Sequence, residues 1–115
     1  MADKNVDRDA LNALREVMED GYPELLDTFL TDSENRLVEL RDAADPKALS
    51  EVAHSFKGSA SNMGAIRLAE LCRQLESGAK DKSPTEIVKL VAEISVEFAE
   101  VRPVYENEKH HAHTH

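Results

Sequence analysis

The chain has 115 residues and a formal net charge of −9, from 23 acidic and 14 basic side chains. This length suits one compact domain, and the acidic balance argues against a protein whose main task is to bind nucleic acid. The first ten residues, MADKNVDRDA, lack the basic and apolar regions of a secretion signal, and no apolar run approaches the ~20 residues that span a bilayer. We expect one cytoplasmic, soluble domain over residues 1–108, with no membrane segment.

Apolar residues recur along the chain at helical rather than strand spacing, which predicts an all-α fold. The first helix covers about residues 7–18, and the turn residues EDGYP follow it. A second, longer helix covers about residues 23–44. Its apolar side consists of Leu26, Phe29, Leu30, Leu37 and Leu40.

Capping signals mark the later helices. Asp45 is a typical N-cap with Pro46 in the first helical position, so a third helix is expected from there to about residue 63. Gly64 is predicted to close it, and a fourth helix follows over about residues 65–78. Ser83 and Glu86 form a capping box that starts a fifth helix, which is expected to kink or stop at Pro103.

Four helices of similar length with short connections predict an antiparallel four-helix bundle, with the short first helix covering one end. Residues 109–115 contain four of the five histidines and no apolar pattern, so we expect a disordered tail there. Two interpretations of this tail are open: a flexible terminus that has no role, or a segment that binds transition metals weakly through its histidines. The single cysteine, Cys72, lies on the apolar side of the fourth helix and is expected to be buried and reduced.

The stretch HSFKGSASNMGA places Gly58 inside the third helix, where glycine costs ~1 kcal/mol relative to alanine. On a helical wheel the apolar residues of this helix share one arc and His54 points to solvent, with Ser50, Lys57, Gly58 and Ser61 on its side. Side chains at i+3 and i+4 lean back over residue i. Gly58 therefore leaves space around His54, and Lys57 can bring an ammonium to a phosphoryl group on it.

Other interpretations of His54 stay open at this point. The face could be a docking surface that is never phosphorylated, in a module that only binds other proteins. Glu51 and His54 have the Glu-x-x-His spacing of a metal-dependent bundle enzyme, but only one copy is present and it faces outward. A nucleophile pair with Cys72 would require that one of the two residues has been placed on the wrong side of its helix.

The stretch AHSFKGSASNMGAIRLAELCRQLE resembles the signature of the histidine-containing phosphotransfer (HPt) domain of bacterial phosphorelays. The resemblance implies a stand-alone HPt protein in which His54 is phosphorylated, Lys57 stabilises the phosphate charge and Gly58 provides clearance. Gly64 matches the second glycine of the motif, while Ser50 and Ser61 are added from the wheel alone. Some members place a glutamine of the next helix near the histidine; Gln74 and Glu76 are both near that point, and neither is assigned the role.

The resemblance also implies a phosphocarrier that is not itself an enzyme. The phosphoryl group would move reversibly between His54 and aspartates of response-regulator receiver domains or hybrid sensor histidine kinases. No intrinsic cofactor or metal is expected, and Mg²⁺ would be bound by the partner receiver. We expect the chain to be a monomer.

Overall fold

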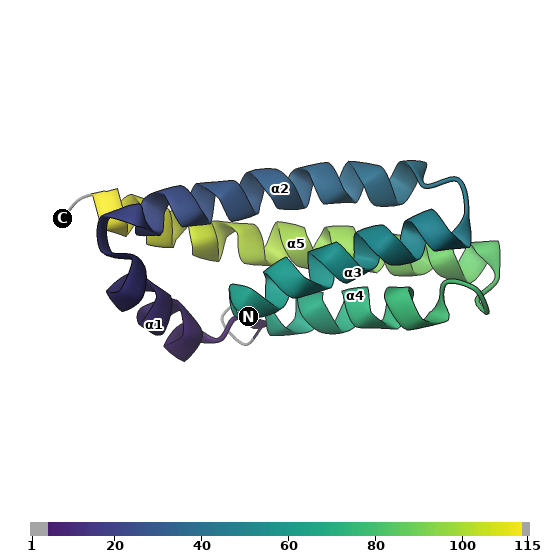
Figure 1. Cartoon of the computed structure of the whole chain (residues 1–115), viewed down its shortest axis with the longest axis horizontal. Helices are drawn as coiled ribbons and strands as arrows, with labels where there is room; N and C mark the ends of the chain where they lie inside the picture. The colour runs from purple at the N-terminus through teal and green to yellow at the C-terminus, as the bar shows by residue number, and fades with distance from the viewer. Residues whose placement is uncertain (1–4, 114–115) are drawn as a thin grey trace.

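The computed structural model describes residues 5–113. In this range the fold is all-α, as predicted, and four long helices run antiparallel to their neighbours (Figure 1). The elements are α1 (Arg8–Met18), the 3-10 turn η2 (Glu19–Gly21), α2 (Tyr22–Asp42), α3 (Pro46–Asn62), α4 (Ile66–Gly78) and α5 (Pro84–His113). All five predicted helices are present, and only the end of the last differs substantially from the prediction.

The predicted capping residues start their helices. Asp45 Oδ1 accepts a hydrogen bond from the Ala48 backbone N–H at 2.8 Å, which caps α3. At the start of α5, the Ser83 N–H donates to Glu86 Oε1 at 3.0 Å and the Glu86 N–H donates to Ser83 Oγ at 3.2 Å. These local bonds fix where the helices begin, independently of the packing between helices.

The short helix α1 covers one end of the bundle, as predicted. Figure 1 shows it beside the ends of α2 and α5, beyond the turn that joins α3 to α4. The Asp7 N–H donates to the Gly64 carbonyl at 2.7 Å, and Leu11 is fully buried. The segment before α1 is thus anchored to the α3–α4 turn.

Gly64 closes α3 in the left-handed conformation, with φ of +75°. A Cβ at this position would lie 3.0 Å from the Asp7 carbonyl oxygen and 3.2 Å from Ala10 Cβ. Gly64→Ala is therefore expected to lower the free energy of unfolding by about 1–2 kcal/mol, because a residue with a Cβ is strained in this conformation. Urea unfolding measures the change.

Gly58→Ala is the matched control, because nothing lies within 4 Å of a Cβ built at Gly58 and the position is helical. This variant should keep or gain stability, by up to ~1 kcal/mol. Equal stability of Gly64→Ala and the unmodified chain would contradict the conformational role of Gly64.

Core residues hold α3 and α5 together near the end of the bundle that α1 covers. The buried Tyr105 hydroxyl donates a hydrogen bond to the Met63 carbonyl at 2.7 Å, and so satisfies a carbonyl at the end of α3. The Tyr105 ring also meets Phe29 edge to face, with centroids 4.9 Å apart. Cys72 is fully buried, as predicted.

The end of α5 differs from the prediction. The helix does not stop at Pro103, although an interior proline removes one backbone hydrogen bond. Buried residues on both sides of the proline, Val101 and Val104, hold the segment against the core. The predicted disordered tail is wrong for residues 109–113, which continue α5, and Lys109 pairs with Asp27 of α2 at 2.9 Å. Residues 114–115 of that prediction lie outside the described range.

Candidate functional site

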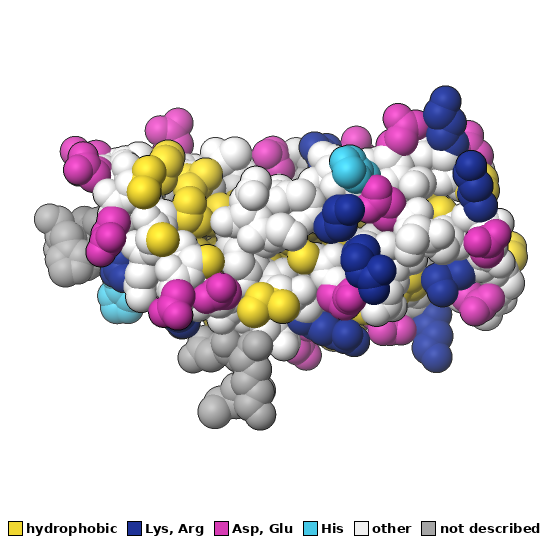
Figure 2. All heavy atoms as spheres, turned by 60° about the horizontal axis from the view of Figure 1, so that its bottom comes forward, with side chains coloured by type: hydrophobic (Ala, Val, Ile, Leu, Met, Phe, Trp, Pro, Cys, Tyr) yellow, Lys and Arg dark blue, Asp and Glu magenta, His cyan; other side chains and the backbone are white. Residues whose placement is uncertain are grey.

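Helix α3 presents His54 to solvent because its apolar residues fix the rotation of the helix. Leu49, Ala53, Phe56 and Ala60 are buried on one side, as the wheel predicted. The side chain of His54 is 69% exposed on the other side. Figure 2 shows a histidine at the surface of the molecule beside basic and acidic side chains.

His54 and Lys57 both contact one carboxylate, Glu76 of α4. His54 Nδ1 lies 2.6 Å from Glu76 Oε2, and Lys57 Nζ donates to Glu76 Oε1 at 2.7 Å. The hydrogen bond from Lys57, with a smaller contribution from His54, holds the pKa of Glu76 below its ordinary value. At neutral pH the carboxylate is therefore ionised and can only accept hydrogen bonds.

The tautomer of neutral His54 follows from this contact. Because ionised Glu76 only accepts, Nδ1 must carry the proton that it donates, and Nε2 of the neutral ring is left with a free lone pair. An exposed imidazole nitrogen with a free lone pair is a competent nucleophile at neutral pH. The arrangement orients the ring and directs its reactive nitrogen away from Glu76.

Gly58 leaves open space one turn after His54. The glycine is exposed, and no atom outside the local helix lies within 4 Å of a Cβ built there. The glycine is thus not required by packing against a neighbouring helix. This observation supports the clearance interpretation, because the space that the missing side chain leaves lies on the face of His54.

The other predicted site residues are more distant or have structural contacts. Ser50 Oγ donates to the Glu76 carbonyl at 3.1 Å, so it ties α3 to α4 beside the histidine. Ser61 is exposed about 10 Å further along α3, at 1.5 Å per residue. Gly64 lies at the end of α3 against the residues before and within α1. The structure therefore brings together His54, Lys57, Gly58 and Ser50, but not Ser61 or Gly64.

Glu76 is the site residue that the sequence left unassigned. The sequence does contain a signal that places Glu76 near His54. Ala65 lies in the α3–α4 turn, and His54 and Glu76 are each eleven residues away from it, on opposite sides. In two antiparallel helices, residues equally distant from the turn lie opposite each other. The same argument also brings Gln74 close, and only the rotation of α4 decides between them.

An open depression of about 450 Å³ lies beside His54. Its lining residues are Lys47, Ser50, Glu51, His54, Glu76 and Lys80. Glu51 lines this space, but the carboxylate that contacts His54 is Glu76. Within residues 5–113, no group of three His, Cys, Asp or Glu side chains is placed to hold a metal ion.

Cys72 is separate from this site. It is buried in the core, and burial raises the pKa of its thiol to about 12. A thiol with such a pKa stays protonated at neutral pH and is a poor nucleophile. The structure gives no support to a Cys–His pair.

Comparison with known proteins identifies the family. The Hpt domain family model matches residues 24–101 of the chain. The crystal structure of histidine-containing phosphotransfer protein B (HptB) from Pseudomonas aeruginosa PAO1 is 44% identical in sequence, with a TM-score of 0.88 over 93% of this chain and 96% of that one. The chain belongs to the Hpt domain family. A search of curated proteins gave no match.

Membership of the Hpt family gives the chain a role in histidine phosphotransfer within phosphorelays. Hpt domains are phosphocarriers rather than enzymes, in general carry no cofactor of their own, and interact with receiver domains and kinases. No helix among the described residues has both the length and the apolar character needed to cross a bilayer.

Proposed function

We propose that His54 is the residue that carries the phosphoryl group, and that it carries it on Nε2. The observation that supports this most directly is the 2.6 Å contact between Nδ1 and Glu76, since it leaves Nε2 unprotonated. His54 is also the histidine of the motif, and its side chain is 69% exposed. A partner domain can therefore reach it without any opening of the bundle.

The transfer step follows from these atoms. Nε2 attacks the phosphorus of an aspartyl phosphate on the partner, the N–P bond forms, and the P–O bond breaks to release the aspartate carboxylate. Positive charge develops on the imidazole ring as the bond forms. Glu76 compensates this charge through the Nδ1–H hydrogen bond. The reverse sequence returns the phosphoryl group to an aspartate.

Lys57 balances the negative charge of the transferred phosphoryl group. Its ammonium has three N–H donors, of which one is used at Glu76 in this structure. Another can bind an oxygen of a phosphoryl group on His54, because residues at i and i+3 are neighbours on a helix. Lys57 thus serves both the carboxylate that orients the ring and the phosphoryl group that the ring accepts.

The proposed exchange partners are receiver domains of response regulators and of hybrid sensor histidine kinases. A receiver brings the reacting aspartate and Mg²⁺ in an acidic pocket. Lys47 and Lys80 line the depression beside His54 and place positive charge where such a pocket would dock. Gly58 leaves room for the approach on the same face.

Phosphotransfer from a labelled receiver tests the proposal. The chain is incubated with receiver domains that carry radiolabelled aspartyl phosphate, and label on the chain is then measured after acid and after base treatment. Phosphohistidine is expected, so the label should be lost in acid and kept in base. Absence of label with every receiver, or a label that resists acid, would contradict the proposal.

Lys57→Ala should keep the fold while it slows phosphoryl transfer or shortens the lifetime of the phosphorylated form. The reason is that the phosphoryl charge loses its nearest cation. Lys109→Ala is a matched control, because Lys109 also joins two helices by an ion pair and is similarly exposed, at 34% against 31% for Lys57. Equal rates and lifetimes for both variants would show that Lys57 is only a surface charge.

A further inference from the structure

A large groove lies at the end of the bundle opposite α1. It has a volume of about 840 Å³ and is bounded by the end of α2, the α2–α3 turn, the start of α3, the α4–α5 turn and the first half of α5. Figure 1 shows both turns at this end of the bundle. Protein sites for small organic molecules have volumes of about 300–1,000 Å³, so the groove is large enough for such a ligand.

The wall of the groove is mainly apolar. The small side chains of Ala43, Ala79 and Ala92 leave the space open, and Val88 and Val96 of α5 border it. Val88 is 69% exposed and Val96 is 59% exposed, so water covers apolar surface there. A ligand with an apolar part would displace this water, which is favourable in proportion to the area that the ligand covers.

Basic side chains dominate the charged part of the lining. Arg41 at the end of α2 lines the groove, and so do Lys80 and Lys82 of the α4–α5 turn. Asp45 is the only acidic lining residue among those that the structure describes, and it already caps α3. Within residues 5–113 none of the three basic side chains makes an ion pair. In a chain of net charge −9, this local excess of positive charge favours an anionic ligand.

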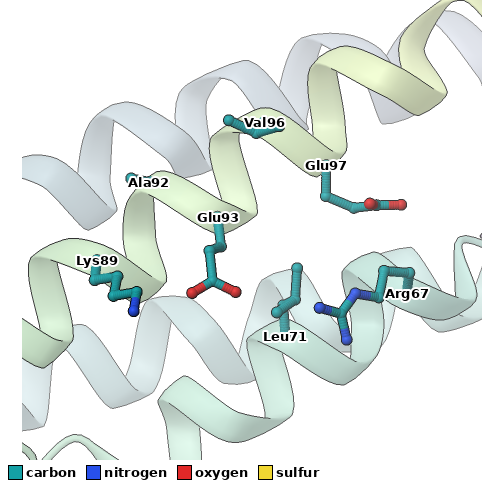
Figure 3. Close-up of a pocket in the computed structure, with 7 residues that line it drawn as sticks. All are labelled: Arg67, Leu71, Lys89, Ala92, Glu93, Val96 and Glu97. Atoms are coloured by element: carbon teal, nitrogen blue, oxygen red, sulfur yellow. The ribbon is translucent and has the colours of Figure 1, made fainter.

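The smaller groove on the other side of α5 has no such excess of positive charge. It has a volume of about 360 Å³ and lies between α4 and α5. Figure 3 shows Lys89 and Glu93 directed toward α4 in this groove, whereas Val96 is directed away from α4. The charged lining residues are two cations and two carboxylates: Arg67, Lys89, Glu93 and Glu97. The positive bias therefore belongs to the larger groove.

The basic side chains stand at the two ends of the larger groove. The ion pair between Glu34 of α2 and Arg102 of α5 shows the register of these antiparallel helices. Arg41 comes seven residues after Glu34, so it lies opposite a point seven residues before Arg102, at the far end of the groove from the α4–α5 turn. Lys80 and Lys82 lie in that turn, just before α5 begins. The turn thus concentrates two cations at one end of an apolar wall.

We propose that this groove binds a straight-chain fatty acid, an amphipathic anion with one carboxylate and a flexible apolar chain. The carboxylate lies at Lys80 and Lys82, and the chain extends along α5 over Val88 toward Val96. The wall from Pro84 to Val96 is about 18 Å long at 1.5 Å per residue, so it contacts an extended chain over its length. Charge selects an acid over an amine, and the apolar wall selects an acyl chain over a small polar anion.

The groove is separate from the phosphotransfer site. His54 and Lys57 do not line it, so a test of binding does not depend on the role of His54. Lys80 is shared between the two regions, because it also lines the depression beside His54. A carboxylate bound at Lys80 would therefore lower the positive charge beside His54 without contacting the ring.

Titration with dodecanoate, followed by amide NMR spectra of the isotope-labelled chain, tests the proposal. Saturable shifts are expected around Ala43, Ala79 and Val88, with a dissociation constant of about 1 mM or below. Decanoate and octanoate should bind more weakly, by about 5- to 10-fold for each two carbons removed. An absence of saturable shifts, or shifts confined to other parts of the chain, would overturn the proposal.

Charge variants test the position of the carboxylate. Lys80→Gln combined with Lys82→Gln should weaken dodecanoate binding by about 10-fold, because both ion pairs are lost. Lys47→Gln combined with Lys89→Gln is the matched control, since it removes the same charge from lysines that do not line the groove. Dodecyltrimethylammonium, which carries the same chain on a cation, should also bind at least about 10-fold more weakly. Equal binding by the two double variants, or of the two ligands, would contradict the selection of an anion.

Val88→Glu tests the path of the acyl chain. It places a like charge in the apolar wall and should abolish dodecanoate binding, while the exposed position lets the helix fold normally. Val38→Glu is its control, because Val38 is an exposed valine of α2 outside the groove and should leave binding unchanged. Unchanged binding by Val88→Glu would overturn the site. Vesicles of phosphatidylglycerol separate a free acid from a membrane surface: association with vesicles by a chain that does not bind dodecanoate would assign the groove to a bilayer and overturn the proposal.

Discussion

His54→Gln is expected to abolish phosphate acceptance while the helical circular dichroism and the melting temperature stay nearly unchanged. Glutamine has no ring nitrogen that can attack phosphorus, so the loss should be complete rather than partial. The fold should tolerate the change because the His54 side chain is 69% exposed and lies outside the core. Label transfer from a phosphorylated receiver measures the first effect, and thermal unfolding measures the second.

His110→Gln is the control for this variant, since His110 is an exposed histidine near the end of α5. It should accept phosphate at the rate of the unmodified chain. Acid-labile phosphate that remains on His54→Gln would show that another residue is phosphorylated. Unfolding of the variant would show instead that His54 has a structural role that its exposure does not indicate.

Gly58→Glu should separate function from stability most clearly. Glutamate is a better helix former than glycine, and nothing lies within 4 Å of a Cβ at this position, so the free energy of unfolding should hold or rise by up to ~1 kcal/mol. Phosphoryl transfer should fall strongly, because the new side chain leans back over His54 and repels both the phosphoryl group and an acidic partner. Urea unfolding and transfer rates measure the two effects.

Asn35→Glu adds the same charge at an exposed position in the middle of α2 and controls for the change in net charge. Its transfer rate should stay close to that of the unmodified chain. A normal transfer rate in Gly58→Glu would refute the clearance argument. Gly58→Ala adds a smaller group without charge, so a reduced rate there would attribute part of the effect to shape alone.

Local signals predicted most of the helices because they act within a few residues. The N-cap at Asp45 and the capping box of Ser83 and Glu86 bond as expected. The apolar side of α3 placed His54 at the surface for the same reason, since helical periodicity alone decides which residues share a face. The motif around His54 also indicated the family, because the motif is a local sequence pattern that does not depend on how the helices pack.

The end of α5 could not be predicted from local signals. The proline at 103 and the polar residues after 108 favour a helix end, but the structure continues to His113. The compensation comes from contacts far apart in sequence: Tyr22 donates a hydrogen bond to Glu108 at 2.8 Å, and Lys109 pairs with Asp27. These partners lie on α2, and local sequence patterns carry no information about them.

The sequence by itself determined the all-α class, the helix starts and the exposure of His54, because each depends on spacing and capping within one helix. Only the tertiary structure decided that Glu76 contacts both His54 and Lys57, and that Val88 and Val96 of α5 stay exposed. Both depend on how one helix is rotated against its neighbours. That rotation is set by the packing of the whole core, where side chains from several helices must fill the same space.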